Sequence, residues 1–368
     1  MNPFKYGCTV EGDCFCRRPK LAKRLKEYIK SGQNVVIQGE RRMGKTSLVL
    51  ETVRGMKGVA LYHADFLFVR DRADLCRRLV TALARLESSE GWFAKIVRAF
   101  AYLKPTVSID PSSGSPTFSV DARLAAEPST LDAILDSLLA LTAKRKVCAV
   151  LDEFQDILDV EDGEQVLAIM RSRLQLDSRT PYIFLGSVRN RMTDIFWHPS
   201  SPFYHSAAAF PVGEIDADDF FAFIKARFAT GKRKLDRATF DAISKLSCAT
   251  PGYVQELCDA VWDETSAGDT IDDSAINRAL NSVFAREQEH FTMFMRRLTA
   301  LQARVLKSIA VLGGKAVFSK EFLASSATYN ASSVKVAVGK LENEEIIYNF
   351  NGEFKFINPF FGEWVRRM

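Results

Sequence analysis

Short apolar runs and helical patterns alternate over roughly the first 213 residues of the chain. The apolar runs span residues 34–38, 59–65, 147–152 and 182–185. Strands covered on both faces are apolar at successive positions, so these runs predict buried strands of a parallel sheet. The segments between them place apolar residues at helical spacing. The fold class predicted is therefore α/β, with a P-loop NTPase type of parallel sheet between layers of helices.

Residues 88–130 interrupt this alternation. Residues 92–104 have a helical pattern, and two alternating runs near 107–109 and 118–120 then flank a stretch rich in Ser and Pro. The pattern favours a β-hairpin inserted in the α/β core, with a disordered loop as the alternative. An insert of this size suits contact with a partner, which the sequence does not identify.

The second half of the chain changes to helical patterns and divides into two predicted domains. After an α/β core over residues 1–213, four amphipathic segments predict a helical lid over 214–290. Residues 291–368 show three further helical patterns and then two short strands that turn at Asn351 and Gly352. Three helices followed by a β-hairpin predict a winged helix-turn-helix.

Charge makes DNA binding the less favoured role for the winged helix. Residues 291–368 contain eleven Lys and Arg and six Asp and Glu, which accounts for the net charge of +5 of the whole chain. The predicted recognition helix, however, sets Lys335 and Lys340 against three glutamates. A helix that reads DNA normally concentrates Lys and Arg. The sequence therefore favours contact with protein, either within the chain or with a partner that it does not name.

The sequence predicts no membrane-spanning helix. Hydrophobic residues make up 47% and charged residues 26% of the chain, as in ordinary globular proteins. No apolar run approaches the roughly 20 residues that a transmembrane helix needs. The N-terminus lacks the pattern of a secretory signal, so we expect a cytoplasmic protein.

A glycine-bracketed loop follows the first apolar run and has the spacing of a P-loop, or Walker A motif. Gly39 is followed after four residues by Gly44, Lys45 and Thr46. Glycines let the backbone amides point inward at phosphate, and the next helix directs its positive end at the same anion. Lys45 would reach the β- and γ-phosphates and Thr46 would coordinate Mg²⁺. The alternative is a Gly-bounded turn before an amphipathic helix. Predicted nucleotide contacts are Gly39, Glu40, Arg41, Arg42, Met43, Gly44, Lys45, Thr46 and Ser47.

The run 147–152 ends in two acids, as a Walker B strand does. Asp152 would bind Mg²⁺, and Glu153 would act as general base toward the attacking water. The alternative is a strand that ends at the acidic start of a helix. Ser187 follows the next strand, where ligands of α/β sheets bind, and is a predicted sensor of the γ-phosphate. Five arginines are candidates for a transition-state contact: Arg171, Arg173, Arg179, Arg189 and Arg191. No guanine-reading Asn-Lys-x-Asp pattern occurs, which favours ATP over GTP.

With these motifs in order, the chain resembles the archaeal-type ATPases of the STAND class, which are related to AAA+ proteins. The resemblance extends over nearly the full length. It is based on the paired arginines inside the P-loop and on the following runs: Leu-Asp-Glu-Phe-Gln, Phe-Leu-Gly-Ser with Arg-Asn-Arg-Met, Ser-Pro-Phe-Tyr, the opening Phe-Cys-Arg-Arg and the closing Phe-Ile-Asn-Pro-Phe-Phe-Gly-Glu-Trp-Val.

The resemblance implies a regulated switch, with ATP or ADP clamped between core, lid and winged helix. It implies that Lys45 and Thr46 hold phosphate and Mg²⁺, that Asp152 and Glu153 serve hydrolysis, and that Ser187 is the sensor. Pro251 matches the proline of the family's lid motif, which contacts adenine, although Ala249 replaces that motif's glycine.

Three functions fit these features. The first is an ATP-dependent molecular switch with slow hydrolysis, in which nucleotide gates homo-oligomerisation or release of a protein partner. The second is a DNA-binding AAA+-like protein of the origin-recognition or transposition-helper type. The third is a nucleotide-binding scaffold without turnover, which would have no need of Glu153.

Overall fold

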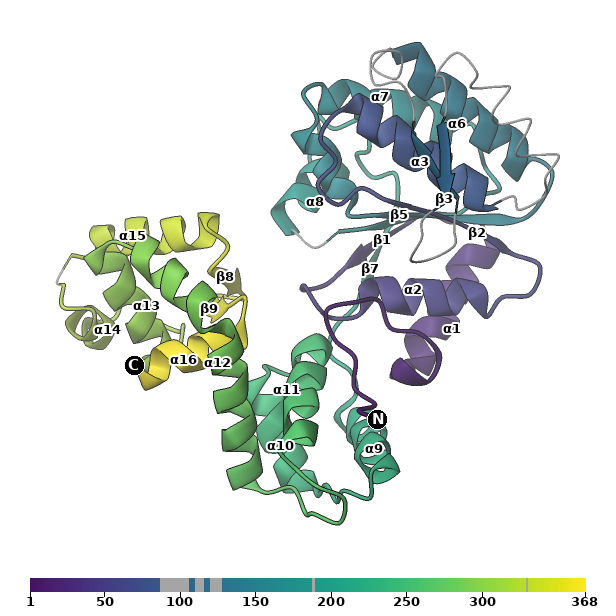
Figure 1. Ribbon diagram of the computed structural model, residues 1–368. Coiled ribbons are helices and arrows are strands. Elements are labelled where there is room, and N and C mark those ends of the chain that lie inside the picture. The colour runs from purple at the N-terminus through teal and green to yellow at the C-terminus, as the bar shows by residue number, and fades with distance from the viewer. Residues whose placement is uncertain (87–105, 110–115, 120–127, 187–188, 329) are drawn as a thin grey trace. The chain divides into compact units, whose positions relative to one another are not determined.

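A computed structural model describes residues 1–86, 106–109, 116–119, 128–186, 189–328 and 330–368 (Figure 1). The chain forms two compact units. One consists of Glu11–Gly213, and the other combines Met1–Val10 with Glu214–Met368.

The first unit is built on a parallel sheet. Among the described residues, its five strands lie in the order β2-β5-β6-β1-β7. The strands are β1 (Val35–Gln38), β2 (Ala60–Asp65), β5 (Val147–Asp152), β6 (Tyr182–Leu185) and β7 (Ala208–Pro211). All pairings between them are parallel, which confirms the predicted sheet. β7 is an edge strand whose short, alanine-rich sequence gave no clear strand pattern.

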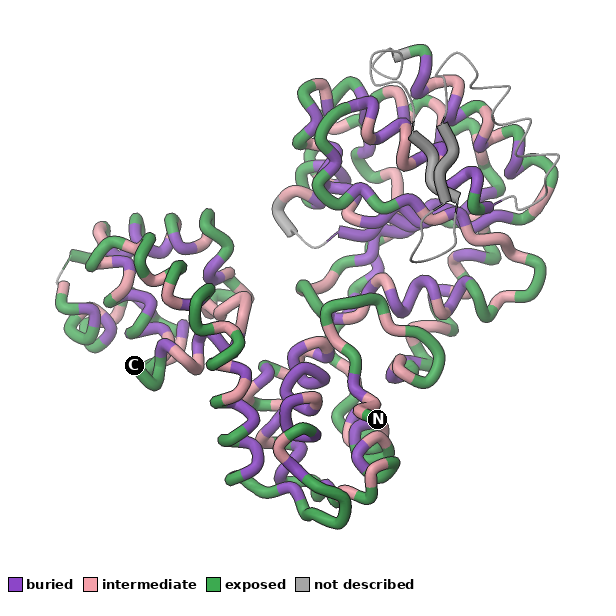
Figure 2. The backbone as a smooth tube through the Cα atoms, in the orientation of Figure 1, coloured by how far each residue is buried: buried purple, intermediate pink, exposed green. Residues whose placement is uncertain are grey.

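Helices cover both faces of this sheet. In Figure 1 α3 (Arg72–Leu86), α6 (Pro128–Thr142) and α7 (Gly163–Leu174) lie over one face, and α1 (Pro19–Lys30) and α2 (Lys45–Arg54) lie over the other. The central strands β5 and β6 are buried throughout and β1 at all but its last residue, whereas the edge strands β2 and β7 are only partly buried (Figure 2). Two further elements, the 3-10 helix η3 (Phe154–Asp159) and α8 (Arg189–Phe196), follow β5 and β6. A short 3-10 helix, η1 (Gly12–Cys14), precedes α1.

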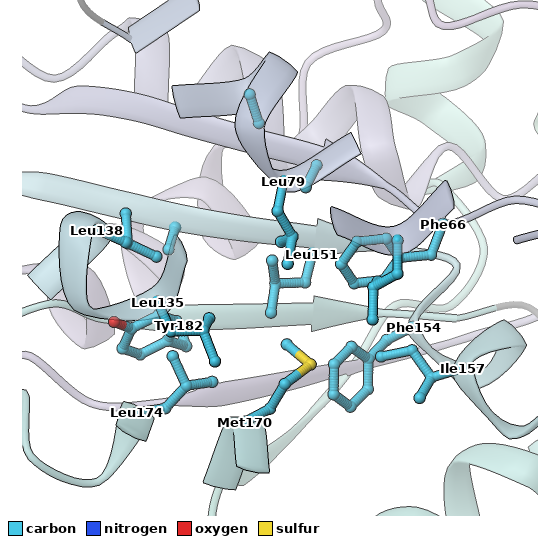
Figure 3. Packing of buried hydrophobic residues seen from close by; sticks show 14 of the residues in the cluster. Phe66, Leu79, Leu135, Leu138, Leu151, Phe154, Ile157, Met170, Leu174 and Tyr182 are labelled. Atoms are coloured by element: carbon cyan, nitrogen blue, oxygen red, sulfur yellow. The ribbon is translucent and has the colours of Figure 1, made fainter. Parts of the chain in front are cut away.

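A hydrophobic cluster fills the space between the sheet and the layer of α3, α6 and α7 (Figure 3). Phe154, the residue directly after the two predicted catalytic acids, is fully buried in this cluster. Its ring centroid lies 4.7 Å from that of Phe184 on β6 and 6.2 Å from that of Phe66. Burial of an aromatic ring of this size fixes the backbone on either side of it. The burial of Phe154 therefore fixes the position of the segment that carries Asp152 and Glu153.

The inserted hairpin is confirmed for the part that the structure describes. β3 (Thr106–Ile109) and β4 (Pro116–Ser119) pair antiparallel, with Val107 opposite Phe118. The helix predicted over 92–104 and the turn at 110–115 lie outside the described residues.

The second unit is helical apart from one hairpin. Its elements are α9 (Ala217–Thr230), α10 (Arg237–Leu246), α11 (Pro251–Asp263), α12 (Asp273–Arg297), α13 (Ala300–Leu312), α14 (Lys320–Ser325), α15 (Ala331–Asn343), β8 (Ile347–Phe350), β9 (Glu353–Phe356) and α16 (Pro359–Arg367). Helices α13, α14 and α15 followed by the hairpin are the predicted winged helix. A side chain caps the start of each of these helices except α11, as where Thr299 and Gln302 form a capping box at α13.

Two details of this unit differ from the sequence prediction. α12 continues to Arg297, beyond the predicted end at 289, because Phe291 is buried and extends its apolar face. The closing segment is a helix, α16, which the hydrophobic pattern did not predict. The Tyr253 hydroxyl on α11 donates to the carbonyl of Ile357, 3.0 Å away, so the lid and the winged helix share contacts.

The first ten residues belong to the second unit, although the sequence prediction assigned 1–213 to one domain. The ring of Phe4 packs against Phe228, with centroids 4.7 Å apart, and against Trp262. Asn2 Nδ2 donates to Asp259 Oδ1 at 2.8 Å. Buried aromatic contact explains why this end follows the helices.

Within the described ranges, no helix combines the length and the apolar character needed to cross a bilayer.

Candidate nucleotide-binding site

The loop between β1 and α2 has the backbone that its glycines predict. Gly44 has φ 75° and ψ 30°, in the left-handed region that glycine adopts without strain. A side chain on Gly39 would overlap the carbonyl oxygen of Val212, so only glycine fits there. In the part of the chain that the structure describes, no side chain caps the start of α2. The first amides of the helix are therefore suited to bind an anion.

Lys45 is buried beneath this loop. Only 8% of the residue is exposed, and its Nζ donates to the carbonyls of Gly39, at 3.0 Å, and Glu40, at 2.8 Å. Burial lowers the pKa of the Lys45 ammonium, and the carboxylates of Glu153 and Asp152 act in the opposite direction. A buried ammonium is costly unless anions surround it. The position therefore favours a bound phosphate.

The two motifs meet through Thr46 and Asp152. Thr46, in the first turn of α2, donates its hydroxyl to Asp152 Oδ2 at 2.8 Å. Asp152 ends β5 and is buried. Hydroxyl and carboxylate oxygens are ligands that Mg²⁺ prefers, and Mg²⁺ at nucleotide sites usually takes one or two protein oxygens plus phosphate. Thr46 and Asp152 thus fit the metal that the motifs imply.

Glu153 is placed by an unusual backbone. It has φ 47° and ψ 43° and precedes η3. Its amide donates to Asp152 Oδ1 at 3.0 Å, and its Oε2 accepts from Gln155 Nε2 at 2.7 Å. A left-handed non-glycine residue is uncommon and often marks a functional position. The predicted metal ligand and the predicted base are therefore held by separate hydrogen bonds.

Several polar residues around these acids were not predicted from the sequence. Gln155 and Asp156 are buried next to Glu153, and the amide of Phe68 donates to Asp156 Oδ2 at 2.7 Å. His63, on β2, places its Nε2 3.7 Å from Asp152 Oδ2. A signal was present in the run Asp-Glu-Phe-Gln-Asp, where four of five residues are polar at and directly after the end of a buried strand.

Arg18 is a further polar residue of the site. Its guanidinium donates to the carbonyl of Met43 in the P-loop, at 2.9 Å, and to the carbonyl of Gly213, at 2.8 Å. Burial lowers the pKa of Arg18 to about 10. In the sequence this residue is visible only as part of the opening segment. In the fold it holds the P-loop backbone against the end of the first unit.

Two of the candidate arginines form ion pairs with aspartates other than Asp152. Arg191 pairs with Asp159 at 2.8 Å, and Arg173 pairs with Asp132 at 2.7 Å. Ser187 and the side chain of Arg189 lie outside the described residues. Pro251 is the first residue of α11, in the other unit, and its contact with adenine stays a prediction.

A family model described as a probable winged helix domain matches residues 289–367. No curated protein sequence matches the chain. The match confirms the predicted winged helix.

Similar solved structures cover almost the whole chain. A Walker-type ATPase of Pyrococcus abyssi superposes with a TM-score of 0.66 and 17% identity, over 99% of both chains. The ORC2 protein of Aeropyrum pernix, in ADPNP–ADP complexes, gives 0.55 and 14% over 95% of this chain and 91% of that one. The ORC1 protein of the same organism, in complex with DNA, gives 0.52 and 12% over 96% and 93%. At these identities the likeness shows the fold alone: a mostly parallel α/β core, helices and a C-terminal winged helix.

Proposed function

We propose that this chain binds and hydrolyses ATP as a molecular switch of the STAND and AAA+ type. The observation that carries the proposal is the 2.8 Å hydrogen bond between Thr46 and Asp152 beside the buried ammonium of Lys45. It joins the Walker A and Walker B motifs into one site. Two of the similar proteins, a Walker-type ATPase and an ORC2 protein in ADPNP–ADP complexes, support an adenine nucleotide.

Each polar residue then has one role. Lys45 binds phosphate oxygens in place of the carbonyls it now contacts. Thr46 and Asp152 hold Mg²⁺, which when bound neutralises charge on the phosphates. Glu153 accepts the proton of the attacking water. Ser187 as γ-phosphate sensor and Pro251 as adenine contact belong to the same proposal.

In this proposal hydrolysis is slow, and the state of the rest of the chain depends on which nucleotide, ATP or ADP, is bound. Ion pairs with aspartates already engage Arg173 and Arg191, two of the candidate arginines. We propose a core, predicted as 1–213 and without its first ten residues in the fold, a lid (214–290) and a winged helix (291–368). The nucleotide controls homo-oligomerisation or a protein partner. The mass of the protein in ADP, compared with a non-hydrolysable ATP analogue, tests this last point.

Calorimetric titration of the purified chain tests nucleotide binding. With Mg²⁺ present, we expect ATP and ADP to bind and GTP to bind at least about tenfold more weakly, because no guanine-reading pattern occurs. The nucleotide that copurifies, identified by chromatography, should also be an adenine nucleotide. A folded, nucleotide-free protein that binds neither ATP nor ADP would refute the proposal.

A second candidate function is DNA binding through the winged helix. It is favoured by the family model over residues 289–367 and by the similar ORC1 protein, whose structure is a complex with DNA. Titration of duplex DNA at several salt concentrations, with and without ATP, tests it, because phosphate contacts make affinity fall steeply with salt. Absence of binding near physiological salt would eliminate this candidate.

A further inference from the structure

Gln155 is buried beside the predicted general base, and its amide has one orientation. Only 2% of the residue is exposed. Its Nε2 donates to Glu153 Oε2 at 2.7 Å and to Asp156 Oδ1 at 2.8 Å. Turning the amide over would set its oxygen against two carboxylate oxygens, which repel it. The two acids therefore fix the nitrogen of Gln155 between them.

The oxygen of the same amide has no stabilising hydrogen bond within the described residues. Gln155 Oε1 is buried and has no hydrogen-bond partner among the residues that the structure describes. It lies at Gly186, after β6, where an added Cβ would overlap both this oxygen and the side chain of Met192. A buried acceptor without a partner costs stability. The residue is therefore better explained by what its nitrogen holds than by packing.

Asp156 is fixed in turn by two other elements. Its Oδ2 accepts from the amide of Phe68, in the loop after β2, at 2.7 Å. Arg191 on α8 approaches its Oδ1 to 4.0 Å. Asp156 is itself buried, so the loop and the helix limit its movement. Gln155 thus connects a fixed carboxylate, that of Asp156, to one that has to act, that of Glu153.

We propose that Gln155 is a positioning residue that, held by Asp156, aims the Glu153 carboxylate at the attacking water. The inference rests on the proposed function. In the step concerned, the water oxygen bonds to the γ-phosphorus, the bond from that phosphorus to the bridging oxygen breaks, and ADP leaves with the electron pair. Glu153 takes the proton of the water and later returns it to solvent. Gln155 exchanges no proton and does not touch the nucleotide.

Substitution Q155M tests this role, because methionine keeps the length of the side chain and removes the donor. We expect kcat for ATP hydrolysis to fall between about tenfold and a hundredfold, the loss typical of a misplaced catalytic group. KM for ATP and the Kd from calorimetry should stay within about twofold, since the phosphate contacts are unchanged. The matched control is Q175M, at an exposed glutamine, which should leave all three constants unchanged.

Two more variants separate positioning from general damage. G186A keeps the side chain of Gln155 but adds a Cβ that would overlap its Oε1 and the side chain of Met192, so kcat should fall in the same direction, also without a change in Kd. If Q155M fails to fold, this variant still tests the role. In the double variant Q155M/E153Q, kcat should equal that of E153Q alone, because there is no longer a base to position.

The outcomes distinguish this inference from the proposed function. If the wild type hydrolyses ATP and Q155M does so at the same rate or faster, the positioning role is refuted and the ATPase stands. A further loss in the double variant, of the size seen in Q155M alone, would also refute it. If the folded wild type binds ATP but releases no phosphate, hydrolysis itself is refuted and the positioning role with it.

Discussion

The α/β core of this chain buries charged side chains next to its predicted motifs, whereas the winged helix exposes the lysines of its predicted recognition helix. Lys45, at the start of α2, and Asp152, at the end of β5, are buried, and each makes hydrogen bonds to described partners. On α15 of the winged helix, Lys335 and Lys340 are exposed, and among the described residues no hydrogen bond holds either side chain. Burying charge costs free energy, whereas charge on a surface costs little. The core therefore contains the groups that need a ligand to explain them.

The largest effect should come from the base. In E153Q, kcat for ATP hydrolysis should fall by about a hundredfold to ten-thousandfold, the contribution typical of general base catalysis. ATP affinity should persist, because Lys45 and Thr46 are intact. Phosphate release and calorimetry measure the two quantities. Turnover equal to that of the wild type would leave Glu153 without a catalytic role.

Next in size is the loss of the buried ammonium. K45A should weaken ATP binding by about a hundredfold, since a charged hydrogen-bonding group at phosphate contributes up to about 3 kcal/mol. The exposed Lys57 supplies the control, and K57A should bind ATP as the wild type does. Equal affinities for both variants and the wild type would show that phosphate does not reach this ammonium.

Arg18 should have a smaller effect because it acts through backbone. R18A removes its hydrogen bonds to the carbonyls of Met43 and Gly213 and frees the P-loop to move. We expect ATP affinity to fall by about fivefold to tenfold, less than the full value of two charged hydrogen bonds, because Arg18 supports the loop rather than the phosphate itself. R17A, at the exposed neighbouring residue, is the matched control. An R18A variant with unchanged affinity would remove Arg18 from the site.

The smallest effect is expected on the winged helix. K335A should change ATP turnover by less than about twofold, because an exposed charge on a helix surface contributes little. Its affinity for duplex DNA, if there is any, should change by a similarly small factor, since three glutamates near the end of the helix oppose its two lysines. A tenfold or greater loss of DNA affinity in K335A would contradict the expectation that variants of the core have larger effects than variants of the winged helix.

Local patterns predicted most of the fold. The P-loop backbone, the Walker B strand and the wing turn at Asn351 and Gly352 each depend on residues adjacent in sequence, and each is found as predicted. α16 has equally local signals, because Asn358 caps it and Pro359 begins it. This helix was therefore predictable from its own residues as well.

The contacts that complete the site could not be predicted from local patterns in the sequence. Arg18 bonds to carbonyls 25 and 195 residues further along the chain, and any residue type can supply a carbonyl. Only the folded arrangement of β1, β7 and α1 brings them together. Gln155 is different, because it stands two residues from Glu153 and its neighbourhood was visible, but its buried amide orientation was not.

Single-turnover release of phosphate from ATP, with the purified full chain in excess and Mg²⁺ present, tests the proposed ATPase most directly. We predict slow release of one phosphate per ATP by the wild type, and none above background by K45A. A folded wild type that releases no phosphate, or a K45A variant that releases it at the wild-type rate, would contradict the proposed function.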